Sequence, residues 1–168
     1  MTPDDAVRSS LCTHMGREFA AHFQYLAMSA WLEGEGLPEM AGFFARQADE
    51  EHMHAMKFFR YIVDTGGPVD FPGQDPPTTT FASAEALVAA ALAQEQQVTT
   101  WIDDLVHLAR EHRDVATEAF LQWFVTEQVE EVSTMGELLQ VVRHAGPSLL
   151  LVEDYVVRRH PAGGAAPA

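Results

Sequence analysis

Apolar residues recur at alternating steps of four and three positions along four long stretches of this chain, each bounded by residues that start or stop helices. This spacing keeps one face of a helix pointing at its neighbours, and it is typical of helices that pack in a bundle. The predicted helices cover residues 5–34, 38–65, 84–111 and 115–145, and a short fifth helix covers residues 149–159. The pattern therefore predicts an all-α fold.

The links between these helices predict the topology. Gly34, Gly36 and Pro38 join the first two helices closely enough to make an antiparallel hairpin, and Asp114 starts the fourth helix directly after the third. Residues 66–82 contain four prolines, so they form neither a helix nor an ordinary strand. When extended, this segment reaches roughly 50 Å, which exceeds the roughly 42 Å of a long helix. We therefore expect two hairpins joined by one long crossover, which is a four-helix bundle.

Length and composition favour one acidic domain. We expect a single core over residues 1–160 and a disordered tail over residues 161–168. The formal net charge of −15 repels nucleic-acid phosphates and anionic lipid, and it favours cations as partners. The chain shows no signal-peptide pattern and no stretch of ~18 apolar residues that could span a membrane. Because Cys12 is the only cysteine, an internal disulfide and a thiolate cluster are excluded. We expect a cytoplasmic protein with no nucleic-acid or membrane partner.

Polar residues interrupt the apolar stripe near the middle of each long helix. In chain order they are Glu18, then Glu51 with His54, then Glu95, then Gln128 with Glu131. The four stripes contain no Lys or Arg, and an unpaired buried charge costs several kcal/mol, so a cation must lie among the carboxylates or most must be protonated. Oxygen ligands with one imidazole suit iron or manganese. The alternative for a single residue such as Glu95 is a paired or half-exposed glutamate.

The two halves of the chain repeat the same spacing. As many residues separate Glu18 from Glu51 as separate Glu95 from Gln128, and a second polar residue follows three positions after Glu51 and after Gln128. Residues three apart on a helix point the same way, so each pair can reach one ion. The repeat predicts a pseudo-twofold bundle with a binuclear metal site.

These residues resemble the pattern of the non-haem ferritins across all four helices. The matching positions are Glu18 and Tyr25, the run from Glu50 to His54, Glu95, and the run from Glu127 to Glu131. The chain is thus similar to a bacterial-type non-haem ferritin, and the resemblance implies a ferritin-like four-helix bundle with a short C-terminal fifth helix. It also implies a hollow cage of 24 identical subunits around a ferric mineral.

The resemblance assigns iron ligands in the central layer. Glu18, Glu51 and His54 would hold a first iron ion. Glu51 would bridge to a second ion, which Glu95 and Glu131 would hold. The family's chemistry is the oxidation of bound Fe(II) by dioxygen, so these residues are the expected ferroxidase ligands.

Further residues receive supporting roles from the same resemblance. Gln128 would support the second ion and its oxygen ligands, and Tyr25 would lie beside the site as a hydrogen-bonding and redox-active phenol. A third iron position would use Glu50, Glu127 and Glu130. Those three residues point away from the central seam, and a solvated acidic face is the alternative interpretation for them.

Departures separate the chain from neighbouring families. Bacterioferritins and rubrerythrins carry a doubled Glu-x-x-His pattern, whereas the second half here has Gln128 and Glu131. A bacterioferritin would place its haem-ligating methionine where this chain has His52, and Met53 is one position away, so no haem is expected. The small DNA-protecting cage proteins lack both the central site and the fifth helix.

Other residues that could bind a ligand are assigned to packing or to the surface. The histidines in this class are His14, His22, His107, His112, His144 and His160. The tryptophans Trp31, Trp101 and Trp123 are expected to be packing anchors. By resemblance, Thr117 and Glu118 correspond to residues that line threefold iron channels of the cage.

The sequence therefore predicts an iron-storage ferritin that oxidises Fe(II) with dioxygen or peroxide and keeps the Fe(III) as a mineral. Each subunit would hold two iron ions and, at the third position, one more. Two alternatives stay open at this point. A di-metal peroxidase, catalase or oxygenase of the same superfamily would turn over peroxide or substrate without storing iron, and a metal-free helical assembly protein would bind no metal tightly.

Overall fold

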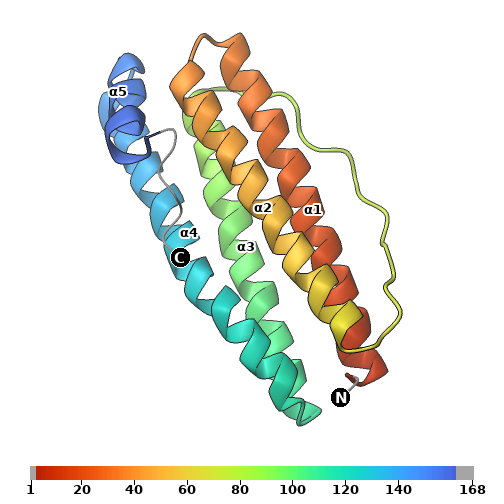
Figure 1. The fold of residues 1–168 in the computed structure, drawn as a ribbon. Helices are drawn as coiled ribbons and strands as arrows, with labels where there is room; N and C mark the ends of the chain where they lie inside the picture. Colours follow the sequence, from red (N-terminus) through yellow and green to blue (C-terminus); the bar gives the residue numbers. More distant parts are fainter. Residues whose placement is uncertain (1–2, 162–168) are drawn as a thin grey trace.

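The computed structural model describes residues 3–161, and this part of the chain folds into five helices without a strand (Figure 1). The helices are α1 (Asp5–Gly34), α2 (Pro38–Asp64), α3 (Ala84–Glu111), α4 (Val115–Ala145) and α5 (Leu150–Arg159). The predicted all-α fold is confirmed, and α5 starts one residue later than predicted because Leu149 is its N-cap. The predicted tail falls, except for Pro161, on residues 162–168, which lie outside the described residues.

The four long helices form the predicted bundle, in which α1 pairs with α2 and α3 pairs with α4 (Figure 1). The connector between α2 and α3 runs along the outside of α1 to the opposite end of the bundle, as the crossover prediction requires. The short α5 packs against α2 and α4 at one end. None of the helices in the described range is long and apolar enough to cross a membrane.

The crossover is tied to α1 along its length. Near its start, Arg8 donates to Asp70 over 3.0 Å, and near its end Gln24 exchanges two 2.9 Å hydrogen bonds with the backbone of Thr78. In between, the prolyl ring of Pro72 lies so close to Gly16 that a Cβ at that position would collide with it. The small residue on α1 therefore lets the extended segment lie flat on the helix.

Local sequence signals set the helix ends. Asp4, Ser83 and Asp114 each accept a hydrogen bond from the first turn of α1, α3 and α4, which is the N-cap arrangement. Helix α2 has no such side chain of its own. Its first amides, at Glu39 and Met40, instead donate to the Glu153 carboxylate of α5 over 2.8 Å each. The fifth helix therefore caps the second, which the sequence pattern did not predict.

A polar layer divides the core into two apolar clusters. One cluster surrounds Phe44 and the C-terminal half of α4, and the other surrounds Phe58 and the N-terminal half of α4. The polar positions predicted for the middle of the four stripes are all buried, namely Glu18, Glu51, His54, Glu95, Gln128 and Glu131. The chain therefore buries carboxylates and an imidazole between two well-packed apolar regions.

Candidate metal centre

The polar layer is built from one face of each long helix. Its buried members are Glu18 on α1, Glu51 and His54 on α2, Glu95 on α3, and Gln128 and Glu131 on α4, each with at most 6% of its surface exposed. Residues three or four apart on a helix share a face, so the central positions of the four stripes meet at one level of the bundle. The predicted central layer is thus present in the fold.

The α1–α2 half of this layer brings three metal-binding side chains together. One ligand atom each from Glu18, Glu51 and His54 lie within 4.8 Å of one another. His54 Nδ1 lies 3.4 Å from Glu51 Oε2 and 4.0 Å from Glu18 Oε2. Two carboxylates and one imidazole at this spacing form a ligand set that suits a divalent iron-like cation.

Charge repulsion and burial favour a cation at this group of side chains. Burial, followed by the charge of Glu18, raises the pKa of Glu51 to about 8. Burial also raises the pKa of Glu18. For His54 burial opposes the charged form, but the carboxylates of Glu51, Glu18 and Glu127 together outweigh it and raise the pKa of the imidazole to about 9. A metal cation can replace the protons that these side chains would otherwise hold.

The α3–α4 half of the layer is held by hydrogen bonds. The phenol of Tyr25 on α1 donates to Glu95 Oε1, and Thr99 donates to Gln128 Oε1 over 3.1 Å. Burial and then the charge of Glu51 raise the pKa of Glu95 to about 8, and burial followed by the charge of Glu95 raises the pKa of Glu131. These carboxylates also favour a cation, but Oε1 of Glu95 is already engaged by the phenol of Tyr25.

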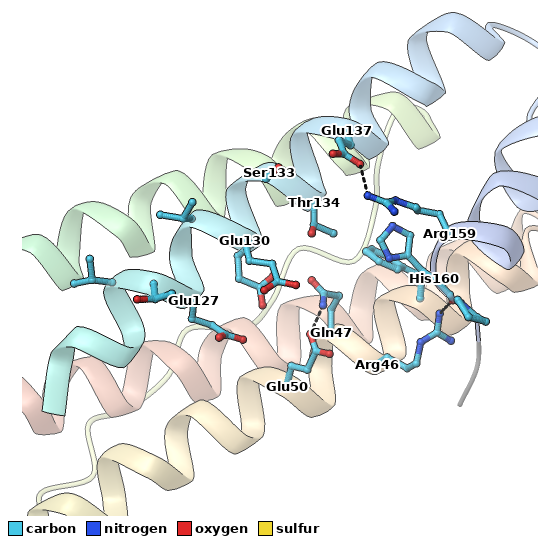
Figure 2. A pocket seen from close by; sticks show the side chains of 16 residues that line it. Arg46, Gln47, Glu50, Glu127, Glu130, Ser133, Thr134, Glu137, Arg159 and His160 are labelled. Atoms are coloured by element: carbon cyan, nitrogen blue, oxygen red, sulfur yellow. Dashed lines mark hydrogen bonds and ion pairs between the residues drawn. The ribbon is translucent and has the colours of Figure 1, made fainter. Parts of the chain in front are cut away.

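A groove of about 870 Å³ between α2, α4 and the end of α5 leads to this half (Figure 2). Glu50, Glu127 and Glu130 line it together with Glu131. Ligand atoms of His54, Glu127 and Glu131 lie within 4.8 Å of one another, so His54 borders both the central layer and the groove. Glu50 accepts a hydrogen bond from Gln47 at the same wall.

A family comparison decides what this arrangement belongs to. Residues 9–145 match the family model described as a ferritin-like domain, and this match covers α2, α3, α4, all but the first turn of α1, and every residue of the polar layer. The chain belongs to the ferritin family. The names of its relatives support a bacterial non-haem ferritin, which is an iron-storage protein.

Two curated ferritins illustrate the similarity. The chain is 41% identical over 150 residues to "Ferritin BfrB" of Mycolicibacterium smegmatis. The aligned residues cover 89% of this chain and 83% of the relative. The chain is 39% identical over 124 residues to a "Bacterial non-heme ferritin" of Staphylococcus aureus, which covers 74% and 75%. Among solved structures, the open-pore ferritin of Archaeoglobus fulgidus superposes with a TM-score of 0.89 at 29% identity, over 91% of this chain and 95% of that one.

The ferritin fold gathers the predicted ligands unequally. Glu18, Glu51 and His54, predicted for the first ion, form one close group. Glu95 and Glu131, predicted for the second ion with Glu51, lie in the same buried layer without forming such a group in the described residues.

The residues predicted for a third ion line the groove, but the structure joins them differently. Glu127 groups with His54 and Glu131 instead of with Glu50 and Glu130. Glu127 is 30% exposed at its side chain, and Glu130 is exposed, so the groove opens outward from the layer. Iron binding by these three residues stays a prediction.

One side chain that sequence reasoning assigned to packing contacts the centre directly. His14 is fully buried on α1, and its Nε2 lies 2.7 Å from Glu18 Oε1. The two residues are four apart on a helix, which is the spacing that places side chains in contact, so the signal was present in the sequence. His52, in contrast, is exposed and lies beside His22 on the outer face of the α1–α2 hairpin.

Proposed function

We propose that this ferritin oxidises ferrous iron at the polar layer, two ions at a time, and stores the ferric product as a mineral inside a cage of 24 identical subunits. Iron is the substrate and cargo, and no haem takes part. The observation that carries the proposal is the close group of Glu18, Glu51 and His54 within a buried layer whose stripes contain no Lys or Arg.

The chemistry follows from where the free oxygens lie. In the described part of the chain, Glu51 Oε2 and Glu95 Oε2 are buried without a hydrogen-bond partner. Buried polar atoms are normally paired, so unpaired carboxylate oxygens favour a cation as the missing partner. We assign the first ion to the Glu18 group, and the second to Glu95 and Glu131 with Glu51 between the two ions.

Two adjacent ferrous ions can deliver the two electrons that reduce one dioxygen molecule to peroxide, with two protons taken up and two ferric ions formed. The four carboxylates balance the charge of two ferrous ions, and also that of two ferric ions bridged by one oxide, so no excess negative charge holds the ferric product. The groove beside the layer is the proposed route, with Glu50, Glu127 and Glu130 as transient oxygen ligands along it.

Assembly into a cage is supported by apolar side chains that a single chain leaves uncovered. On α5, Leu150 and Leu151 are 77% and 62% exposed. Exposed leucines of this kind favour burial against symmetry-related copies. Cytoplasmic location is part of the same proposal.

The test is aerobic loading of the purified protein with Fe(II), followed by sizing of the particle and measurement of retained iron. We expect rapid absorbance of ferric iron and a large particle that keeps it. The variant His54→Ala should slow oxidation by at least about 10-fold, whereas His107→Ala, which changes an exposed histidine, should not. Peroxide turnover without retained iron would instead favour a di-metal peroxidase or oxygenase, and oxidation at the parent rate in His54→Ala would refute the site.

A further inference from the structure

His14 lies next to the proposed iron centre without belonging to the expected ligand set. It is buried one helical turn before Glu18, with its ring packed at 4.8 Å from that of Phe58. Its Nε2 contacts Glu18 Oε1 at 2.7 Å, the length of a strong hydrogen bond to a carboxylate. A polar side chain in the apolar wall of the core therefore makes its single polar contact in the described chain with a proposed iron ligand.

The two oxygens of Glu18 have different surroundings. Oε1 faces His14, whereas Oε2 is buried, has no hydrogen-bond partner in the described residues, and lies 4.0 Å from Nδ1 of His54. Oε2 is thus the oxygen that faces the other two ligands. With an ion on Oε2 the carboxylate is ionised and can only accept, so Nε2 of His14 carries the hydrogen and donates it.

The other ring nitrogen is consistent with this assignment. His14 Nδ1 is buried and has no partner in the described residues, so it carries no hydrogen that needs an acceptor. A ring with its hydrogen on Nε2 and none on Nδ1 is neutral. A neutral donor can orient Glu18 without adding a positive charge that would repel iron.

We propose that His14 is a positioning residue that occupies Glu18 Oε1 and thereby presents Oε2 alone to the first ion. Without the donor, the carboxylate can rotate about its terminal bond and offer both oxygens, or neither, to the metal. Groups that orient a metal ligand typically contribute about 10-fold or more to affinity. Loss of the contact should therefore change both the affinity for the first ion and its coordination.

Two amide substitutions separate the hydrogen bond from packing. In His14→Gln the amide nitrogen reaches nearly as far as Nε2, so it can donate to Glu18. In His14→Asn the same amide is one methylene shorter and cannot reach. Met15→Leu, a volume-conserving change at the neighbouring buried position, is the matched control for core disturbance.

The probe is Co(II), used under anaerobic conditions so that it is not oxidised. Its visible absorption bands change with coordination number. We expect wild type, His14→Gln and Met15→Leu to share one spectrum and affinity for the first Co(II). His14→Asn should bind it about 10-fold more weakly, with altered band intensity. Thermal melts of all four proteins check that each is folded.

The inference rests on the proposed role of Glu18, and the titration separates the two. If Glu18→Ala binds the first Co(II) as tightly as wild type, the proposed site is wrong. If Glu18→Ala loses that ion while His14→Asn keeps the wild-type spectrum and affinity, only the positioning role of His14 is overturned. A His14→Gln variant that behaves like His14→Asn would also overturn it, because a donor at the same reach would then have no effect.

Discussion

The two halves of the polar layer carry matching spacings in the sequence and yet differ in how their side chains are engaged. In the α1–α2 half, ligand atoms of Glu18, Glu51 and His54 already lie within 4.8 Å of one another. In the α3–α4 half, Glu95 accepts from Tyr25 and Gln128 accepts from Thr99. The first half therefore already has three possible ligands close together, whereas in the second half Glu95 and Glu131 do not form such a group in the described residues.

This difference suggests an order of filling. An ion that enters the α1–α2 half meets oriented ligands and pays little for rearrangement. An ion in the α3–α4 half needs Glu95 Oε2, which is free in the described chain, while Oε1 stays with Tyr25. We expect sequential binding, with Glu51 as the one carboxylate that both ions need.

The largest effect is expected for Glu51→Ala, because it removes a ligand from both halves at once. Oxidation of Fe(II) should slow by about 100-fold or more, beyond the loss typical of an outer contact. The neighbouring Glu50→Ala removes a carboxylate from the groove and serves as the control, with a much smaller loss. Stopped-flow absorbance of ferric iron measures both, and equal effects of the two substitutions would remove the special role of Glu51.

A smaller and more selective effect should separate the halves. Glu18→Ala should lower the affinity for the first Co(II) ion by at least about 10-fold. Glu95→Ala should leave the affinity for the first Co(II) ion unchanged and lower only the affinity for the second. Trp123, whose ring lies 5.4 Å from that of His54, supplies a fluorescence signal that Co(II) near His54 should quench. If Glu95→Ala weakens the first ion as strongly as Glu18→Ala does, the two halves fill together and the sequential order is wrong.

Gln128 marks the place where the internal repeat is broken, and its substitution should act on turnover rather than on the first oxidation. The four carboxylates of the layer balance two ferrous ions, or two ferric ions bridged by one oxide. A fifth carboxylate adds a negative charge, worth about 4 kcal/mol per unit charge at ~4 Å with an effective dielectric near 20, before desolvation. Ferric product gains most from that charge and leaves more slowly.

We therefore expect Gln128→Glu to oxidise its first two ferrous ions per subunit normally and to process later additions about 10-fold more slowly. Repeated additions of Fe(II) with absorbance detection measure this directly. The control is Gln128→Asn, which keeps the amide without a charge and loses reach. Slow later turnover in the Asn variant with parent behaviour in the Glu variant would assign Gln128 a geometric role.

The sequence predicted the bundle and the level of the site because both depend on periodicity. The stripes through Glu18, Glu51, Glu95 and Gln128 follow the helical repeat, and the prolines after Gly66 cannot continue a helix, so burial and topology followed directly. The cap residue Asp114 predicted the start of α4 in the same way.

Contacts that depend on side-chain direction were not predicted. The grouping of Glu127 with His54 and Glu131 depends on how side chains from α2 and α4 converge at the groove, which spacing along one helix does not determine. The cap that Glu153 gives to α2 joins residues far apart in the chain. His14 was the avoidable omission, since its spacing from Glu18 is local.

The smallest expected effect is a pH-dependent stability of the metal-free protein, and its sign follows from the raised pKa values. Folding raises the pKa of Glu51 and of Glu95 from 4.5 to about 8, and that of His54 from 6.5 to about 9. The folded state therefore holds more protons than the unfolded state in these windows. The stability that each of these groups contributes is fully present below its unfolded-state pKa, and it is lost as the pH rises through its folded-state pKa. His14 acts in the opposite direction, but only between pH 6.5 and about 3.

Between pH 6.5 and about 9, the melting temperature of the metal-free protein should thus fall as pH rises, by about 2–4 °C for each kcal/mol lost. Glu95→Gln mimics the protonated carboxyl, still accepts from Tyr25, and should flatten the slope, whereas Glu111→Gln at an exposed position should not. Zn(II) binds the deprotonated ligands and should reverse the slope in the same range. A melting temperature that rises with pH in the metal-free protein, or a slope that Glu95→Gln leaves unchanged, would show that the buried carboxyls of the α3–α4 half are ionised without an ion. That half would then be as ready for metal as the first, and the contrast between the two halves would not hold.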